Sequence, residues 1–408
     1  MKKLIGPFKQ ILTLAALPLK GSLRDDQLEI ITNGGVLVED GLIKEVGKFD
    51  ELHRLYPDVT IEEIEGGQVL LPGFIDCHTH ICFGGNRAKD YALRIAGKTY
   101  LEIAKAGGGI WDTVTQTRLA NEQTLLDGLL KRANHHLSEG VTTIEVKSGY
   151  GLNFDDELKQ LRVIKNAGKL TGADLVPTCL AAHMLPKDFR ADKAQYLQYV
   201  LNELLPVIRQ EQLSNRVDIF IEESAFDTAS AKIYLDAAIK LGFNATVHAD
   251  QFTTGGSEVA VEVGALSADH LEASKAKEIR LLAKSNTVAV VLPGASLGLG
   301  MPYAPARKLL DAGSCVAIAS DWNPGSAPMG DLLLQASVIA AAEKLTTTEV
   351  FAGLTSRAAK ALNLNDRGVI ATGMLADLQA YPYNDYREIL YYQGKLKPGM
   401  VWKKGNVV

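Results

Sequence analysis

The sequence is poor in cysteine, has no excess of positive charge and contains no long apolar run. Only 4 of its 408 residues are cysteine, none in a Cys-x-x-Cys pair, which is typical of reduced thiols in a cytoplasmic protein. The formal net charge is -5 without a long run of Lys or Arg, which argues against nucleic acid or an anionic membrane surface as a partner. No stretch approaches the ~20 apolar residues of a membrane span, and Pro7, Lys9 and Gln10 interrupt the one segment that resembles a signal peptide.

Two glycine-rich nucleotide-binding motifs are missing as well. No Gly-x-Gly-x-x-Gly follows the first buried segment, which disfavours an open dinucleotide-binding sheet. The glycine-rich stretches 106–110 and 294–300 have no accompanying Gly-Lys-Ser/Thr, so neither is a phosphate loop. Their glycines are expected to allow close backbone approach in loops over the mouth of the fold.

The sequence does contain eight apolar segments, most of them followed by a stretch with helical periodicity. With 47% hydrophobic residues, the chain is long enough to bury a large core. Eight buried strands with helical crossovers predict an α/β fold, a (β/α)8 TIM-type barrel. The segments are 73–80, 141–148, 174–183, 217–224, 244–250, 265–270, 286–293 and 315–321.

The two ends of the chain have a different pattern. Residues 28–48 are interpreted as two or three short strands around turns at Asn33–Gly35 and Glu39–Gly41. The C-terminal end has similar strand-like stretches that Pro and Gly interrupt. Both ends are therefore expected to build one small composite β domain, sandwich-like in form. The predicted ranges are 1–70 and 365–408 for this domain and 71–364 for the barrel.

Polar residues stand at the carboxyl ends of the apolar segments, which meet at one face of a parallel barrel. His78 and His80 lie two residues apart in a strand, so both side chains point to the same side. His248, His270 and Asp321 end later segments. Because an unpaired buried charge costs several kcal/mol, these residues predict a shared site. Imidazole and carboxylate together suit a divalent ion such as Zn²⁺ or Fe²⁺ that activates a water.

The order of these residues resembles that of the amidohydrolase superfamily, with His-x-His on the first strand and Asp on the last. Within it, the chain is similar to the imidazolonepropionase family of L-histidine degradation. This resemblance implies hydrolysis of the cyclic amide C–N bond of 4-imidazolone-5-propanoate to give N-formimidoyl-L-glutamate. The motifs that support it are CFGGNRAKDYALRIAGKTYLEIAKAGGGI (82–110), EVKSGYGL (145–152), AAHMLP (181–186), VHADQ (247–251) and SDWNPGSAP (320–328).

The resemblance also implies the composition of the site. It implies one metal ion per chain, zinc or iron, with His78, His80, His248 and Asp321 as ligands and His270 nearby in a hydrogen-bonding role. The binuclear branch of the superfamily bridges its metals with a carboxylated lysine on the fourth strand. Lys147 falls on the second strand here, so a second metal is not expected. The implied substrate contacts are Arg87, Tyr100, Tyr150, His183, Gln251, Asn323, Gly325 and Ser326.

The expected reaction gives roles to individual residues. Asp321 and His270 help to deprotonate the metal-activated water that attacks the ring carbonyl, and His270 also stabilises the oxyanion. Gln251 stands three residues after the fifth-strand histidine, where deaminases of the superfamily typically have a glutamate. Because an amide cannot relay a proton, Gln251 disfavours deamination; it could hold a ring nitrogen or the attacking water. Arg87 offers a planar fork for the propionate.

Three other functions stay open at this point. They are another cyclic amide or amidine hydrolase or deaminase of the superfamily, a dipeptide hydrolase with two metals, and a barrel that binds without catalysing. A cytoplasmic homodimer is expected, with a small-molecule substrate as its partner. Of the remaining polar residues, we assign His53, His135 and His136 to the surface or to packing, and Lys147 either to an ion pair with Glu145 or Glu222 or to a substrate contact.

Overall fold

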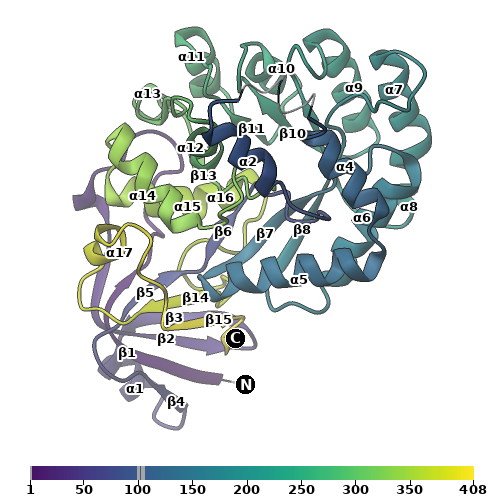
Figure 1. The fold of residues 1–408 in the computed structure, drawn as a ribbon. Helices are drawn as coiled ribbons and strands as arrows, with labels where there is room; N and C mark the ends of the chain where they lie inside the picture. Colours follow the sequence, from purple (N-terminus) through teal and green to yellow (C-terminus); the bar gives the residue numbers. More distant parts are fainter. Residues whose placement is uncertain (1, 99–101, 103–105) are drawn as a thin grey trace.

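One of the two eight-stranded sheets is a parallel barrel, whose strands follow one another in chain order. The computed structural model describes residues 2–98, 102 and 106–408, and the barrel fills the upper part of Figure 1. Each of the eight predicted segments overlaps one of its strands. The strands are β6 (Phe74–Asp76), β7 (Val141–Lys147), β8 (Asp174–Ala182), β9 (Arg216–Phe220), β10 (Asn244–Ala249), β11 (Ser267–His270), β12 (Val288–Val291) and β13 (Val316–Ile318).

Helices follow most of these strands and surround the barrel (Figure 1). In α5, leucines and Ala133 at helical spacing are buried against β7, and the Asn121 side chain accepts a hydrogen bond from the backbone of Thr124 at the first turn. The helices are α2 (Ala88–Ile95), α4 (Ile110–Leu119), α5 (Glu122–Ser138), α6 (Phe154–Ala167), α7 (Lys193–Tyr199), α8 (Leu205–Gln210), α9 (Thr228–Lys240), α10 (Gly256–Glu262), α11 (Ala276–Lys284), α12 (Pro293–Leu299), α13 (Ala306–Ala312), α14 (Leu332–Glu343), α15 (Thr347–Leu354) and α16 (Ser356–Ala361).

The first and last strands of the barrel are joined just beyond their carboxyl ends. The backbone N–H of Asp321 donates to the carbonyl oxygen of His78 at 3.0 Å, and the N–H of His80 donates to that of Trp322 at 2.9 Å. Thr79 forms a parallel bridge with Trp322 between these two bonds. The barrel is therefore closed by the backbone of residues that were predicted to bind the metal.

The second sheet is mixed and combines both ends of the chain, as expected. Its strand order is β16-β15-β14-β5-β1-β2-β3, with β4 paired to β1, and a core around Phe8 and Trp402 is fully buried. The antiparallel pairing of β5 with β14 joins the N-terminal strands to the C-terminal ones. The strands are β1 (Lys2–Leu12), β2 (Ile30–Glu39), β3 (Leu42–Lys48), β4 (Thr60–Glu63), β5 (Val69–Pro72), β14 (Leu378–Tyr381), β15 (Met400–Lys403) and β16 (Asn406–Val407).

One of the two predicted turns in this sheet is wrong. β2 runs without interruption through Asn33–Gly35, and the glycines serve close packing instead of a turn. A Cβ atom on Gly34 would lie 2.5 Å from the side chain of Ile11 on β1, so a larger residue would force this buried side chain to shift. The other turn is present between β2 and β3, where Asp40 and Gly41 both have positive φ.

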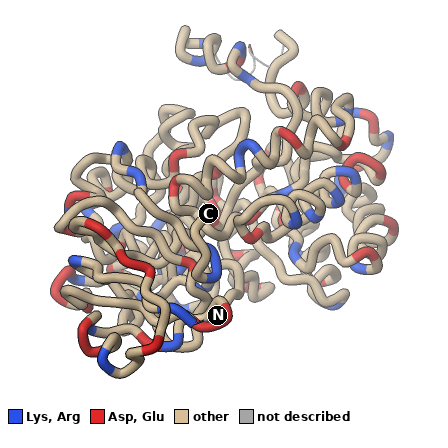
Figure 2. Tube along the Cα trace, turned by 90° about the horizontal axis from the view of Figure 1, so that it is seen from below, with Lys and Arg blue, Asp and Glu red and all other residues tan. Residues whose placement is uncertain are grey.

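Charges of both signs are distributed over the whole molecule. Figure 2 shows Lys and Arg interleaved with Asp and Glu along the tube. Among the described residues, no helix has both the length and the apolar character needed to cross a bilayer. The four cysteines are free and buried.

His136 is a packing residue, the second of its two predicted roles. It lies on α5 and is fully buried, with Nε2 3.0 Å from Oδ2 of Asp76 on β6. Its ring packs against Trp322 at a centroid distance of 4.8 Å. The other carboxylate oxygen of Asp76 accepts the backbone N–H of Ser320 at 3.0 Å, so this contact supports the seam between the first and last strands.

We expect His136→Ala to lower the free energy of unfolding by about 2–4 kcal/mol, because it leaves a void and deprives a buried carboxylate of its neighbour. Chemical denaturation measures this change. His53→Ala is the matched control, since His53 is exposed on α1 (Phe49–Leu55), and its effect should stay within about 0.5 kcal/mol. Equal effects of the two substitutions would contradict a structural role for His136.

Candidate metal centre

Three buried histidines converge at the carboxyl end of the barrel. His78 and His80 follow β6, and His248 lies in β10, four strands away in the barrel order. Their possible ligand atoms all lie within 4.8 Å of one another. The Nε2 atoms of His80 and His248 are 3.2 Å apart. Strand alternation and the parallel register thus direct three imidazoles into one small volume.

Asp321 completes this group from beyond the last strand. Its Oδ1 atom lies 3.5 Å from Nε2 of His78 and 3.3 Å from Nε2 of His80. Its backbone has a φ of +49°, a left-handed conformation that the bond to the carbonyl of His78 holds in place. The structure therefore brings together all four residues that the sequence analysis proposed as ligands.

The donor set fits a borderline divalent cation. Nε2 of His78 is buried and has no hydrogen-bond partner among the described residues, although it faces the other ligands. Burial, reinforced by Lys147 and by the neighbouring histidines, lowers the pKa of His78 and His80 well below the usual range. Burial also lowers the pKa of His248 to about 3, although Asp218 opposes the shift. The three rings are thus neutral and present lone pairs to a common point, which suits Zn²⁺ or Fe²⁺.

Two carboxylates that are not among the predicted site residues stand behind the rings. Oδ2 of Asp269 lies 2.6 Å from Nδ1 of His78, and Oδ2 of Asp218 lies 2.9 Å from Nδ1 of His248. Such partners fix the tautomer and direct the free Nε2 toward a metal. The available signal was an aspartate within each of two buried strands, in VDIF and SADH. Which histidine each one serves depends on the register of the barrel.

His270 differs from the three other histidines in its charge environment. It lies at the end of β11, and its ring centroid is 5.2 Å from that of His248. Burial by itself would lower its pKa, but Glu272, whose carboxylate is 3.6 Å from Nδ1, raises it above the ordinary value. His270 is therefore suited to hold a proton beside the neutral ligand rings.

Two side chains proposed to bind substrate lie beside His80, and a third, Arg87, lies against Gly325 in the loop after Asp321. The rings of Tyr150 and His183 lie 6.0 and 5.6 Å from that of His80, and Nδ1 of His183 is 3.0 Å from the carbonyl of Gly149. Burial raises the pKa of Tyr150, so its hydroxyl stays protonated, and burial lowers the pKa of His183 to about 4. Arg87, before α2, donates through Nε to Asp90 at 2.8 Å, which leaves the two terminal nitrogens of its fork for other partners.

The loop after Asp321 places Gly325 against Arg87. A Cβ atom on Gly325 would collide with the guanidinium of Arg87, so the two segments meet across the mouth. The Asn323 side chain accepts the backbone N–H groups of Gly325 and Ser326 at 2.7 and 2.8 Å and donates to the carbonyl of Asp321 at 2.7 Å. Asn323 therefore shapes the loop, while Ser326 Oγ lies 3.5 Å from Oδ2 of Asp321.

The remaining predicted residues have less defined surroundings. Gln251 is buried two residues beyond the end of β10. Tyr100 lies outside the described residues. Lys147 pairs with Glu145 at 2.9 Å, one of its two expected partners. Glu222, the other, instead accepts the backbone N–H of Phe252 at 2.8 Å.

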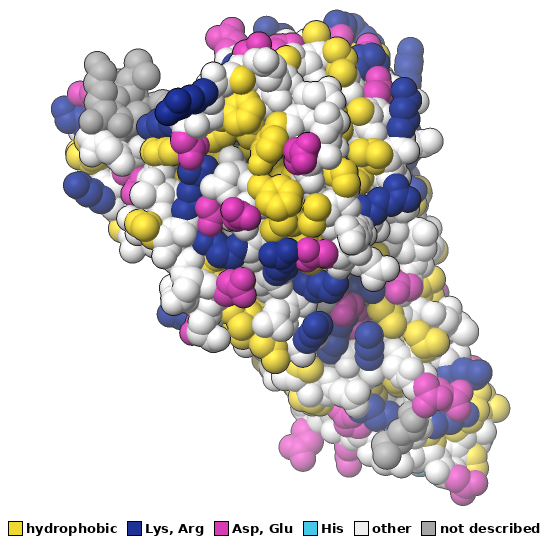
Figure 3. All heavy atoms as spheres, turned by 90° about the vertical axis from the view of Figure 1, so that its right-hand side faces the viewer, with side chains coloured by type: hydrophobic (Ala, Val, Ile, Leu, Met, Phe, Trp, Pro, Cys, Tyr) yellow, Lys and Arg dark blue, Asp and Glu magenta, His cyan; other side chains and the backbone are white. Residues whose placement is uncertain are grey.

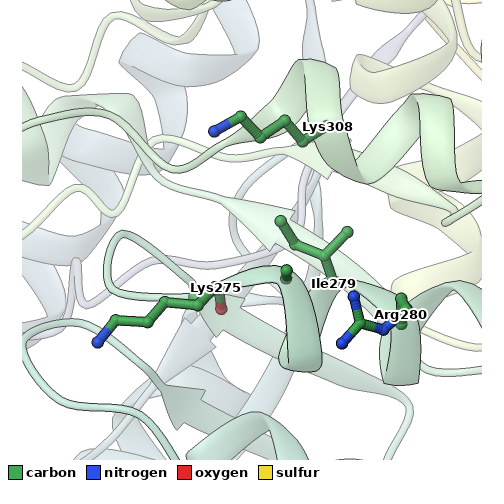
Figure 4. Close-up of a pocket in the computed structure, with 6 residues that line it drawn as sticks. Lys275, Ile279, Arg280 and Lys308 are labelled. Atoms are coloured by element: carbon green, nitrogen blue, oxygen red, sulfur yellow. The ribbon is translucent and has the colours of Figure 1, made fainter.

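One hollow in the surface lies beside Arg87 and Trp322, and another lies between α11 and α13. A cavity of about 610 Å³ is bordered by Arg87, Tyr91 and Trp322, and no histidine of the metal centre lines it. In the hollow between α11 and α13, Figure 4 shows that the side-chain amino groups of Lys275 and Lys308 lie apart from each other. Figure 3 shows apolar side chains gathered on one side of the barrel among charged ones.

Comparisons with known proteins agree with this geometry. A model described as "Amidohydrolase family" matches residues 98–408, and one described as "Imidazolonepropionase-like composite domain, bacteria" matches residues 34–58. The chain is 40% identical over 386 residues to a protein from Fusobacterium nucleatum named imidazolonepropionase, covering 94% of this chain and 93% of that one. It is 43% identical over 367 residues to a protein of the same name from Paracoccus denitrificans, covering 90% and 92% of the two chains.

Solved structures show the same fold at low sequence identity. The structure of a zinc-complexed atrazine chlorohydrolase from Arthrobacter aurescens superposes with a TM-score of 0.74 at 17% identity, covering 99% of this chain and 94% of that one. A guanine deaminase from C. acetobutylicum with bound guanine superposes with a TM-score of 0.68 at 17% identity and full coverage of both chains. These neighbours bear on the fold alone.

Adding Zn²⁺ or Fe²⁺ to metal-stripped protein is expected to raise its melting temperature, because only the folded chain brings the three histidines together. At a free metal concentration a thousandfold above Kd, the free energy of unfolding rises by about 4 kcal/mol. Differential scanning calorimetry with and without metal measures it. His78→Ala should lose the gain and His53→Ala should keep it; a gain of equal size in both variants would locate the metal elsewhere.

Proposed function

This chain belongs to the imidazolonepropionase family of the amidohydrolases, and we propose that it opens the ring of 4-imidazolone-5-propanoate by hydrolysis, giving N-formimidoyl-L-glutamate. The bond cleaved is the cyclic amide C–N bond. The observation that carries the proposal is the meeting of His78, His80, His248 and Asp321 at one point of the barrel mouth, with Arg87 across it. No feature of the site favours one of the three other functions.

The proposal includes one zinc or iron ion, held by the three histidines and Asp321. When bound, such an ion lowers the pKa of a water and polarises the ring carbonyl. The chlorohydrolase of similar fold is complexed with zinc, which is in keeping with the donor set, but zinc and iron share these ligand types. The metal content of the purified protein decides between them.

Asp321 is proposed to accept the proton of the attacking water. One carboxylate oxygen faces the histidines, while the other lies toward Ser326 and the mouth. Burial raises the pKa of Asp321, although the nearby histidines His270 and His248 oppose the shift, which makes its carboxylate a better base than an exposed one. His270 is proposed to donate a hydrogen bond to the oxyanion, and the raised pKa that Glu272 gives it supports this role. The proton that Asp321 takes from the water then passes to the ring nitrogen as the C–N bond breaks.

The substrate is held by groups around the mouth. The terminal nitrogens of Arg87, which make no hydrogen bond to the described residues, suit the propionate, since a guanidinium binds a carboxylate through two parallel hydrogen bonds. Tyr150 and His183 lie beside His80 and are proposed to contact the imidazolone ring of the substrate. Gln251 is proposed to hold a ring nitrogen or the attacking water, because an amide cannot carry a proton to departing ammonia. Tyr100, Asn323, Gly325 and Ser326 complete the proposed contacts.

The setting of the enzyme is part of the proposal. Four buried, free cysteines are typical of a protein of the reducing cytoplasm. The assembly into a homodimer stays a prediction, which the mass of the particle in solution tests. A spectrophotometric assay with freshly made imidazolonepropionate, on metal-replete and metal-stripped protein, tests the activity. Ring opening releases no ammonia, so measuring ammonia in the same samples separates it from deamination.

We expect Asp321→Asn to lower kcat by about a thousandfold or more, because the amide is a weaker ligand and cannot accept the proton. Steady-state kinetics measures the loss, with the metal content determined on the same sample. Asp385→Asn, at a surface ion pair with Arg387, is the control and should leave kcat unchanged. Near-normal turnover of the Asp321 variant would remove this residue from the mechanism.

Arg87→Ala should raise KM by roughly 10- to 100-fold with a smaller effect on kcat, because it removes charge-assisted hydrogen bonds to the propionate. Initial rates over a range of substrate concentrations separate the two constants. Arg162→Ala, which breaks a surface pair with Glu211, is the matched control. An unchanged KM in the Arg87 variant would show that another group binds the propionate.

A further inference from the structure

Glu145 and Lys147 on β7 form a fully buried ion pair that the proposed reaction does not use. They lie two residues apart on one face of the strand, with Nζ of Lys147 2.9 Å from Oε1 of Glu145. Removing both charges from water is costly, and a buried pair often contributes little net stability. A pair in this place therefore calls for a role besides stability.

The pair holds the strand that supplies two of the metal ligands. Thr79 stands between His78 and His80, and its backbone N–H donates to Oε2 of Glu145 at 3.0 Å. The Thr79 hydroxyl donates to the carbonyl of Glu145 at 2.6 Å, and the N–H of Lys147 donates to the carbonyl of Thr79 at 3.0 Å. These three bonds fix the backbone from which both histidines project.

The same pair reaches the third histidine through Asp218 on β9. Nζ of Lys147 lies 3.0 Å from Oδ2 of Asp218, the oxygen that is 2.9 Å from Nδ1 of His248. The other oxygen of Asp218 accepts the backbone N–H of His248 at 3.2 Å. Lys147 thus connects Glu145, and through it the backbone of Thr79, to the carboxylate that orients the ring of His248.

We propose that Glu145 and Lys147 are positioning residues. They fix the position of His78 and His80, which follow β6, relative to that of His248 on β10. The ring of His78 is also tied to β10, because Oδ2 of Asp269 lies 2.6 Å from its Nδ1 and accepts the hydroxyl of Thr246 at 3.2 Å. The link through Glu145 and Lys147 is a second tie, and it acts on the backbone between His78 and His80. Both side chains are fully buried, and Nζ of Lys147 is held between Glu145 and Asp218, so the pair is proposed to act through the geometry of the metal site. This inference rests on the metal centre proposed above.

The double variant Glu145→Gln/Lys147→Met tests the link without changing net charge, because it removes one positive and one negative group. The glutamine side chain keeps an oxygen that can accept the N–H of Thr79, so the variant breaks the ion pair and spares the backbone contact. The metal-stripped variant is loaded with Co²⁺, whose visible absorption reports the ligand geometry. We expect a changed absorption spectrum and a Co²⁺ affinity about 10- to 100-fold below that of the unmodified chain, measured by competition with a chelator.

Lys403→Met/Asp377→Asn is the matched control. Lys403 is also a buried lysine between two carboxylates, with Nζ 2.5 Å from Asp377 and 2.7 Å from Asp174, but it lies on β15 of the mixed sheet. The control should lower the melting temperature of the metal-free and Co²⁺-loaded forms equally and leave the spectrum and the affinity unchanged. If the first double variant does not fold, Lys147→Gln replaces it, with a shift of the same two quantities expected.

The outcomes separate this inference from the metal centre itself. A changed spectrum with weaker binding supports it. A variant that matches the unmodified chain in spectrum and affinity, with a loss of stability like that of the control, overturns it while the metal centre stands. An unmodified chain that binds no Co²⁺ overturns both.

Discussion

Burial of uncharged imidazoles is the constraint on which the mouth of this barrel depends. Three histidines with bare ring nitrogens a few ångströms apart would repel one another if protonated, and burial keeps the proton off each ring. The carboxylates of Asp269 and Asp218 hold the opposite nitrogens of His78 and His248, so that each of these two rings has one preferred orientation. A neutral, oriented cluster of this kind is complementary to a cation and to little else.

Closure of the barrel and assembly of the site are the same event in this fold. The bonds that join the first and last strands use the backbones of His78, His80, Asp321 and Trp322. A displaced seam would therefore move ligands on both sides of it. Asp76 supports the seam from behind through Ser320 and His136, so packing on α5 reaches the metal centre through one carboxylate.

The sequence predicts the strands well because parallel strands buried on both faces read as apolar runs, and all eight appear where expected. Their polar ends likewise predict which residues meet. The failures concern contacts between distant segments. Asn33–Gly35 looks like a turn, and only the packing of Gly34 against Ile11 shows why glycine is needed there. The partners of Lys147 depend on how β7 and β9 are placed around the barrel, which one strand alone does not reveal.

The histidines of the site divide into two kinds through their neighbours rather than their burial, which is nearly the same for all. His78 and His248 face carboxylates, yet desolvation and the surrounding cations dominate and lower their pKa values. His270 faces Glu272 at the rim, and the balance reverses, so its pKa rises. A proton that enters this cluster is therefore directed to His270, and the ligand nitrogens stay free. One barrel end therefore holds two kinds of ring, neutral ones that suit a cation and one whose raised pKa favours keeping a proton, with the ring centroids of His248 and His270 5.2 Å apart.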